Sequence, residues 1–160
     1  MGNRPSAPCF FTYIYIGRLR QLNDWAHMPS IMVQESLLDE AMMTTILVIE
    51  RNPVVRKTVA HMVCMAGFRA VGAAQPDGAL YAIKTMELGC LIALTKPSGQ
   101  TTESFIELAK RLRPSLPIVL SRKIALMPDY RGLIAGQLDS PFYVVDLKNV
   151  LNDALSVTNA

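Results

Sequence analysis

Short apolar runs alternate with longer amphipathic segments along most of the chain, from Thr44 onward. Continuous apolar runs are typical of strands buried on both faces, as in a parallel sheet covered by helices. The longer segments carry apolar residues at helical spacing. Strict alternation of the two patterns predicts an α/β domain with right-handed crossovers. The predicted strands cover residues 46–49, 68–73, 90–95, 117–121 and 137–139, and the predicted helices cover residues 53–66, 77–88, 101–113, 127–135 and 142–157.

Residues with strong local preferences mark the ends of these helices. Asn52 is predicted to cap the first helix, and Asp77 is predicted to cap the second. Gly67 and Gly89 follow these two helices, where glycine readily adopts the backbone conformation that ends a helix. The face of the third helix that is predicted to be buried comprises Phe105, Leu108, Ala109 and Leu112.

The first 42 residues lack this regular pattern and are predicted to form an irregular extension to a domain at 43–160. Their one periodic stretch is a weakly amphipathic run at 30–43. Two interpretations stay open. In the first, translation starts at Met42 or Met43, so that the upstream part is not made. In the second, the extension is an arm that docks on the domain or on a partner.

The composition fits an ordinary globular domain. The sequence is 51% hydrophobic and 18% charged, which excludes a mainly disordered chain. Its net charge of +3 is too small to indicate a nucleic-acid partner by itself. Cys9, Cys64 and Cys90 are odd in number and lack C-x-x-C spacing, so they predict a reducing, cytoplasmic setting rather than disulfides or a zinc site. No apolar run reaches the length of about 18 residues that a membrane span needs.

Motifs of the common enzyme classes are missing from the sequence. The predicted first strand is followed by E-R-N-P at 50–53 instead of a glycine-rich phosphate-binding turn. The chain contains neither a P-loop nor a nucleophile elbow, and it has no metal-spaced set of His, Cys or Glu residues. The sequence therefore does not predict an enzyme. Nucleic-acid binding stays open as an alternative. The basic residues that motivate it are Lys110, Arg111, Arg113, Arg122 and Lys123.

Several short segments stand in a characteristic order across the regular region. They are I-L-V-I-E-R-N-P-V-V-R at 46–56, A-G-F at 66–68, G-A-L at 78–80, R-P-S-L-P-I-V-L-S at 113–121 and S-P-F-Y-V-V-D-L-K-N-V-L at 140–151. Through them, residues 45–157 resemble the receiver domain of two-component response regulators. The resemblance implies a doubly wound, flavodoxin-like (CheY-like) sheet of five parallel strands in the order 2-1-3-4-5.

The resemblance also implies a chemistry. Receiver domains accept a phosphoryl group from a histidine kinase onto an aspartate at the end of the third strand. An acidic pair after the first strand holds Mg²⁺, and a Thr or Ser after the fourth strand and a Lys after the fifth contact the phosphoryl group. In this sequence the corresponding residues are Glu50 and Arg51 for the acidic pair, Ala93 for the phosphoacceptor, Ser121 for the hydroxyl residue and Ser140 for the lysine.

These residues predict that the usual chemistry is lost. An acyl phosphate needs a carboxylate nucleophile, which Ala93 does not have. Mg²⁺ prefers several hard oxygen ligands, so Glu50 alone beside the cationic Arg51 is an insufficient site. We therefore expect neither aspartyl phosphorylation nor Mg²⁺ binding, and no other cofactor. Glu50 and Arg51 are expected to serve the structure, through contacts with each other or with neighbouring residues.

We interpret the sequence as a stand-alone degenerate receiver domain that works in phosphorelay signal transduction through phosphorylation-independent protein contacts. The expected partner is a signalling protein such as a histidine kinase or another regulator, or a second copy of the chain, and not a membrane. Gln137 stands where receivers often carry a switching aromatic residue, and apolar residues are in excess at the start of the last helix. The predicted interaction surface comprises Gln137, Phe142, Tyr143 and Val144. A further alternative is regulation by a small ligand at the altered pocket.

Overall fold

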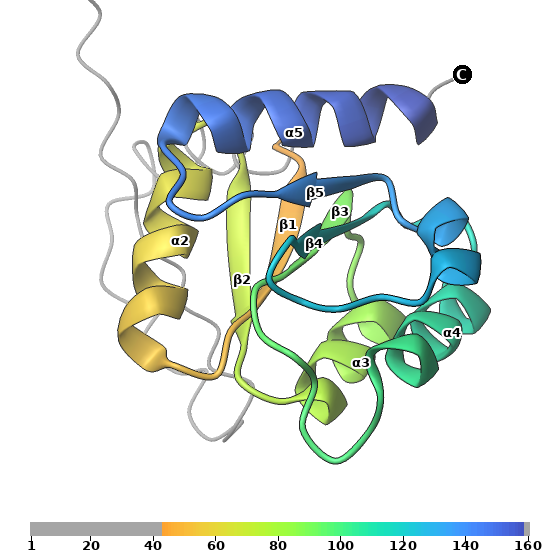
Figure 1. Ribbon diagram of the computed structural model, residues 1–160. Coiled ribbons are helices and arrows are strands. Elements are labelled where there is room, and N and C mark those ends of the chain that lie inside the picture. Colours follow the sequence, from red (N-terminus) through yellow and green to blue (C-terminus); the bar gives the residue numbers. More distant parts are fainter. Residues whose placement is uncertain (1–42, 159–160) are drawn as a thin grey trace, which may run out of the picture.

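The computed structural model describes residues 43–158, and a five-stranded parallel sheet lies at its centre (Figure 1). Along the chain the elements are β1 (Thr45–Ile49), α2 (Pro53–Met65), β2 (Arg69–Ala73), α3 (Pro76–Thr85), β3 (Cys90–Ala93), α4 (Thr102–Leu112), β4 (Ile118–Ser121), the 3-10 helix η2 (Pro128–Leu133), β5 (Gly136–Leu138) and α5 (Val144–Thr158). The strand order is β2-β1-β3-β4-β5, and every neighbouring pair is parallel. The predicted flavodoxin-like fold is confirmed.

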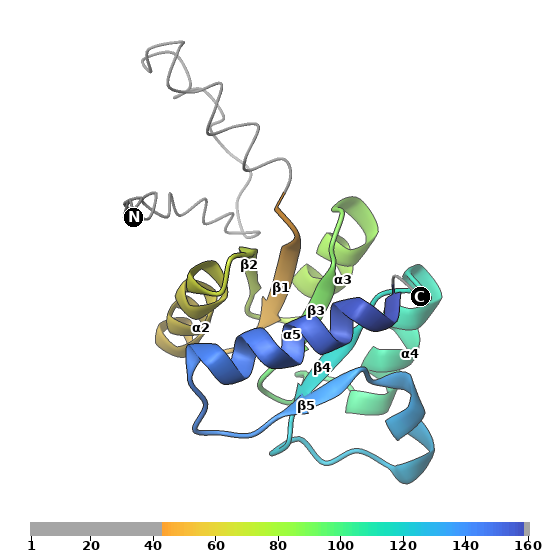
Figure 2. The same cartoon turned by 90° about the horizontal axis from the view of Figure 1, so that it is seen from above.

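Alternating side chains divide the core into two apolar clusters, one on each face of the sheet. In β1, Leu47 and Ile49 belong to the cluster that α3 and α4 cover. Ile46 and Val48 belong to the cluster that α2 and α5 cover. Figures 1 and 2 show the two pairs of helices on opposite faces of the sheet. Burial on both faces explains why the strands are continuous apolar runs in the sequence.

The helix boundaries confirm some predictions and correct others. The Asn52 side chain caps α2 by accepting from the backbone N–H groups of Val54 and Val55, and Gly67 follows that helix with φ +97. By contrast, Asp77 is not a cap. Helix α3 begins one residue earlier, at Pro76, and Asp77 lies within its first turn, where a negative charge is favourable to the helix dipole.

Gly89 does not end a helix, because α3 already ends at Thr85. A Cβ atom at position 89 would overlap Cγ2 of Thr44, so one of the two residues would have to move. The glycine is therefore explained by the close approach of the chain entering β3 to the residue that precedes β1.

The buried face of α4 differs from the prediction by a rotation about the helix axis. Phe105 and Ala109 are buried as predicted, and Ile106 is buried as well. Leu108 and Leu112 are 39% and 45% exposed. The buried residues of α4 are Thr102, Phe105, Ile106 and Ala109. Their spacing of three and four residues places them on one face of the helix.

The largest difference from the sequence prediction lies between β4 and β5. An α-helix is predicted at 127–135, but the chain forms only the six-residue 3-10 helix η2, none of whose residues is buried. Gly132 within it disfavours a longer α-helix. The last α-helix is also shorter than predicted at its beginning, since α5 starts at Val144 and leaves Phe142 in the preceding loop.

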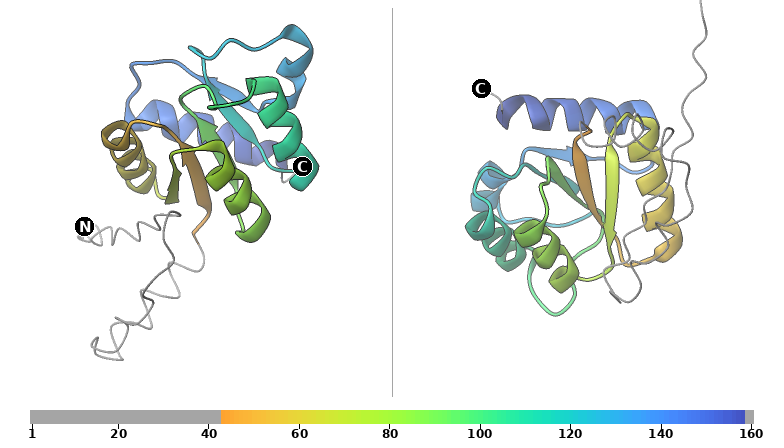
Figure 3. Two further views of the ribbon diagram at one scale, coloured as in Figure 1. Left: turned by 90° about the horizontal axis from the view of Figure 1, so that it is seen from below. Right: turned by 180° about the vertical axis from the view of Figure 1, so that it is seen from behind.

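Polar contacts with α4 hold η2 in place. The backbone N–H of Met127 donates to Oε1 of Glu103 (3.2 Å), and the Tyr130 hydroxyl donates to Oε1 of Glu107. Figure 3 shows η2 beside α4 on the side of the sheet away from α2. The η2 segment is therefore attached through exposed hydrogen bonds, while Ile124, Leu126 and Ile134 on either side of it pack on the core cluster beneath α3 and α4.

The predicted N-terminal extension, with its amphipathic run, lies outside the described residues except for Met43. Within residues 43–158, none of the helices combines the length and the apolar character that crossing a membrane would require.

Candidate functional site

Three of the predicted site positions come together at the carboxyl edge of the sheet. The register pairs Ile49 of β1 with Ala93 of β3, and Ala93 with Leu120 of β4. Glu50 directly follows Ile49, and Ser121 directly follows Leu120, so the two residues flank the end of β3 on its two sides. Loops at this edge are the usual location of sites in doubly wound sheets.

Glu50 is buried, with 4% of its surface exposed. Its backbone N–H donates to the carbonyl oxygen of Ala73 (3.1 Å), which continues the pairing of β1 with β2. Its carboxylate oxygen Oε1 accepts from the backbone N–H of Asn52 (2.8 Å). The carboxylate therefore has a structural role: it closes the turn that leads from β1 into the capped start of α2.

Arg56 is a member of this site that was not predicted. It lies in α2 and is only 3% exposed, and its Nη1 donates to the carbonyl oxygens of Glu50 (2.7 Å) and Arg51 (3.3 Å). Its stem crosses β2 at Gly72, where a Cβ atom would lie 3.1 Å from Cδ of Arg56. An arginine on the helix face that meets the sheet was the available signal in the sequence.

Arg51 joins the loop after β1 to the loop after β3. Its backbone N–H lies 3.4 Å from Oγ1 of Thr95, and its Nη2 donates to Oγ of Ser98 (2.6 Å) and lies 3.5 Å from the carbonyl oxygen of Lys96. All of these acceptors are uncharged. Arg51 and Glu50 thus bond to different partners, and the positive charge of the guanidinium at the edge of the sheet is not neutralised by Glu50.

Ala93 is 1% exposed and belongs to the apolar cluster covered by α3 and α4. Its side chain is a methyl group, so the end of β3 carries neither a nucleophile nor a metal ligand at this position. The described residues 43–158 contain no group of three or more His, Cys, Asp or Glu side chains that could hold a metal ion. One buried carboxylate beside a guanidinium does not match the several hard oxygen ligands that Mg²⁺ prefers.

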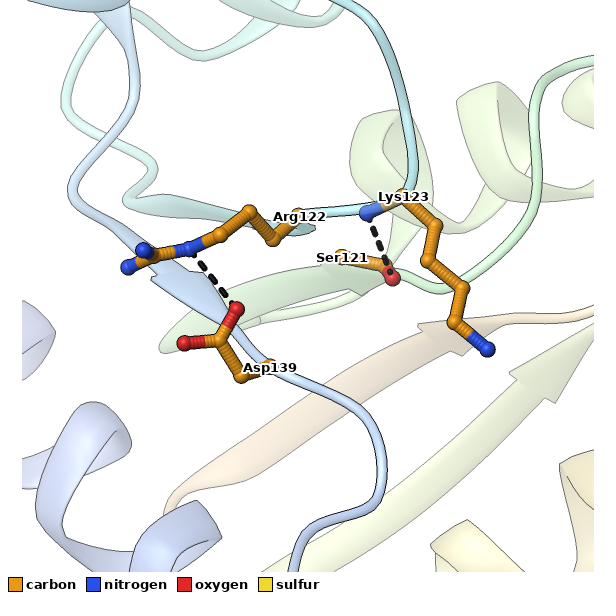
Figure 4. Close-up of polar contacts among 4 residues, drawn as sticks. All are labelled: Ser121, Arg122, Lys123 and Asp139. Carbon is orange, nitrogen blue, oxygen red and sulfur yellow. Dashed lines mark hydrogen bonds and ion pairs between the residues drawn. The ribbon is translucent and has the colours of Figure 1, made fainter.

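The end of β4 contributes one hydroxyl and two cations, shown in Figure 4. Ser121 is 2% exposed, and its Oγ accepts from the backbone N–H of Lys123 (3.4 Å). Nε of Arg122 forms an ion pair with Oδ1 of Asp139 across the end of β5 (2.7 Å). The side chains of Arg122 and Lys123 leave the end of β4 in opposite directions, the first toward Asp139 and the second away from it.

The residues of the predicted interaction surface fall into different environments. Gln137 is half-buried in β5, where it pairs with Leu120. Phe142 is half-buried and packs against the cluster beneath α2 and α5, so it belongs to the core. Val144 is half-buried, whereas Tyr143 is 74% exposed. Ser140 is exposed and precedes a cis peptide bond to Pro141.

The basic residues considered for nucleic-acid binding lie at two opposite edges of the sheet. At the end of α4, Lys110 Nζ donates to the carbonyl oxygen of Leu116 (2.7 Å) and Arg113 Nη2 donates to that of Met86 (2.7 Å). Partial burial lowers the pKa of Lys110. Arg122 and Lys123 follow β4 at the other edge, so the five basic residues do not form one continuous patch.

No protein-family model and no curated protein matches this sequence. Several solved structures share its fold. A response regulator receiver domain protein from Clostridium thermocellum has a TM-score of 0.65 at 14% identity, over 73% of this chain and 98% of its own. A CheY-like receiver domain protein from Methanospirillum hungatei JF-1 has a TM-score of 0.66 at 15% identity, over 73% of this chain and 97% of its own.

A third similar structure contains a metal. The receiver domain of a sensor histidine kinase from Pseudomonas aeruginosa PAO1, with a magnesium ion coordinated in its active-site cleft, has a TM-score of 0.62 at 18% identity, over 71% of this chain and 98% of its own. Together these likenesses show that the described chain has the fold of response regulator receiver domains. Function must be argued from the site, because one fold supports many functions.

Proposed function

We propose that this protein is a degenerate receiver domain that acts in two-component signal transduction through protein contacts that do not depend on phosphorylation. The receiver fold supports the pathway class. The chemistry of the carboxyl edge supports the loss of phosphorylation, because Ala93 occupies the phosphoacceptor position that the resemblance implies, four residues before Pro97.

The observation that carries this proposal is the position of Arg51. Its guanidinium contacts Ser98 and the Lys96 carbonyl, next to the end of β3. A divalent cation placed there would meet a fixed positive charge at close range. The one nearby carboxylate, on Glu50, is buried and already accepts a hydrogen bond from Asn52. Hydrogen bonds among Glu50, Arg51, Asn52 and Ser98 hold this edge together, and we propose that it binds no metal ion.

The test is incubation of the full chain with acetyl phosphate and Mg²⁺, followed by intact-mass measurement. We expect no gain of a phosphoryl group. A gain that is lost on mild base treatment would show an acyl phosphate and would overturn the proposal. A receiver domain that retains the aspartate, treated in parallel, controls for the activity of the donor.

Ala93→Asp is the companion variant. We expect it to restore little phosphorylation, because Arg51 still opposes metal binding and Ser140 supplies no cation for the phosphoryl group. Efficient phosphorylation of this variant would mean that Arg51 and Ser140 are compatible with the chemistry and that Ala93 alone accounts for its loss.

The proposed contact surface is the outer side of β5 together with the start of α5. β5 is the last strand of the sheet, so within the described residues one of its edges has no strand partner. Tyr143 and Val145, which follow β5 in the chain, are 74% and 60% exposed. Exposed apolar side chains next to an open strand edge favour association. The occupant we propose is a second copy of the chain or a signalling protein such as a histidine kinase.

A further inference from the structure

Uncompensated positive charge gathers around the end of β3. Arg51 follows β1, Lys96 follows β3 and Lys123 follows β4, and all three side chains are exposed. β1 and β4 flank β3 in the sheet. Neighbouring strands lie about 4.8 Å apart, so the loops that carry Arg51 and Lys123 begin about 10 Å apart. Long basic side chains on either side of such a gap can both contact one small ligand between them.

The Arg51 guanidinium is fixed in place without being neutralised. Its hydrogen bonds go to the Ser98 hydroxyl and the Lys96 carbonyl, which are uncharged acceptors. Both contacts use Nη2, and arginine offers five N–H donors in a rigid fork that matches phosphate and carboxylate geometry. The remaining donors are available to an anion, and part of the entropic cost of ordering this side chain has already been met.

The charge of Lys123 is likewise not neutralised, unlike that of its neighbour Arg122. Arg122 is paired with Asp139 (2.7 Å), whereas the Lys123 ammonium makes no hydrogen bond or ion pair with any described residue. Figure 4 shows its side chain directed away from Asp139, toward the side of the sheet on which β3 and β1 lie. Its backbone N–H is anchored to Ser121, so the lysine projects from a defined position.

The negative groups near the end of β3 are fewer than the positive ones. In the loops after β1, β3 and β4 the carboxylate is that of Glu50, which is buried and bonded to Asn52. Asp139, after β5, is used by Arg122. Ala93, at the end of β3, has a buried methyl group, whereas a carboxylate there would repel an anion.

We propose that this edge binds the phosphate group of a small phosphorylated molecule directly, without a metal ion, through Arg51 and Lys123. Lys96 adds positive charge at the mouth of the site. The proposal rests on the proposed function in one respect, namely that the site has lost its phosphoacceptor and its metal. The phosphate is held noncovalently and no bond is made or broken.

The test is a titration of the ¹⁵N-labelled full chain with inorganic phosphate, and separately with phenyl phosphate as a monoester, in EDTA at constant ionic strength. We expect saturable amide shifts confined to residues near 51–52, 95–98 and 121–124. Arg51→Gln and Lys123→Gln should each weaken binding about tenfold, the loss expected for one charge-assisted hydrogen bond. Lys148→Gln, an exposed lysine in α5, is the matched control and should leave binding unchanged.

Ala93→Asp is an independent test. The new carboxylate at the end of β3 should repel phosphate and abolish its binding while the fold is retained. Shifts that increase linearly, that chloride reproduces, or that survive in both glutamine variants would overturn the proposal. Binding of the monoester but not of inorganic phosphate would assign the site to an organic phosphate, and equal binding would assign it to the phosphate group alone. Failure of phosphate binding leaves the mass measurement with acetyl phosphate unaffected, so the two proposals fail separately.

Discussion

The loop between β1 and α2 and the segment from η2 to the start of α5 are both polar connections, but different contacts hold them. In the first, the buried Arg56 side chain donates to the carbonyl oxygens of Glu50 and Arg51, and the buried Glu50 carboxylate accepts from Asn52. In the second, no residue of η2 is buried, and its recorded side-chain contacts are exposed.

This difference separates stability from binding. Hydrogen bonds to a buried charged group contribute more to folding than exposed ones, which compete with water. We therefore expect substitutions at the first region to change the free energy of unfolding. Substitutions of exposed residues in the second region should leave it nearly unchanged and affect contacts with other molecules instead. The predictions below test this contrast in order of decreasing effect on stability.

Arg56→Met should have the largest effect. Methionine keeps a long apolar stem over Gly72 but removes the donor that satisfies the Glu50 and Arg51 carbonyl oxygens. A buried acceptor left without its partner costs about 2 kcal/mol of folding free energy. Urea unfolding followed by circular dichroism measures the loss. Lys57→Met, at the exposed neighbouring position, is the control and should change little.

Asn52→Ala should have an intermediate effect. The Asn52 side chain accepts from the Val54 and Val55 backbone N–H groups at the start of α2, and removing such a cap costs about 1 kcal/mol. The same urea measurement applies. Asn52→Asp retains an acceptor and should recover most of the stability. If Asn52→Ala left the free energy of unfolding unchanged, the loop after β1 would not be the ordered region that its hydrogen bonds indicate.

The fold was predictable because strand burial is a property of whole runs. The apolar runs Ile46–Ile49 and Ile118–Leu120 identify two strands even when the residues that pack against them are not known. The orientation of Leu108 in α4 was not predictable, because a stripe with several apolar candidates leaves the rotation of the helix undetermined until the sheet beneath it is known. The position of η2 beside α4 depends likewise on contacts with Glu103 and Glu107, which are far away in the sequence.

The site was predictable in part, for a related reason. Glu50, Arg51, Ala93 and Ser121 lie at strand ends, which the pattern of apolar runs locates directly. The role of Arg56 depends on the close approach of α2 to Gly72, and that of Ser98 depends on the path of the loop after β3. An arginine on the sheet-facing side of the predicted helix marks Arg56 as unusual, but neither of these two approaches can be located from the sequence alone.

Glu107→Gln should affect η2 with little effect on global stability. The hydrogen bond from Tyr130 to Glu107 raises the pKa of the Tyr130 phenol, and charge from Glu103 and Asp129 adds to the shift. Replacing the carboxylate with an amide weakens this hydrogen bond and removes the negative charge of Glu107, so the pKa of Tyr130 should fall toward the usual value of about 10. Absorbance titration at alkaline pH measures it, with Tyr130→Phe identifying the signal. Amide exchange in 127–133 should accelerate, while exchange in β1 and β3 stays the same.

Tyr143→Glu should have the smallest effect on stability and a large effect on association. Tyr143 is 74% exposed, so its side chain contributes little to the core, and its backbone N–H donates to the Asp146 carboxylate whatever side chain it carries (2.8 Å). A new carboxylate in the centre of an apolar contact must be desolvated without a partner, which is costly. The melting temperature and circular dichroism should therefore match those of the parent chain, while self-association measured by sedimentation velocity is lost.

Val157→Glu is the matched control for this change. Val157 is 71% exposed near the other end of the same helix, so it introduces an equal charge on α5 away from β5. Self-association should persist in this variant, and should be unaffected by Mg²⁺ or acetyl phosphate in the parent chain. Loss of association in both variants would point to charge on α5 in general rather than to the surface beside β5. Association that survives Tyr143→Glu would mean that the contact lies on another face of the protein. Association that requires the phosphodonor would mean that it depends on phosphorylation.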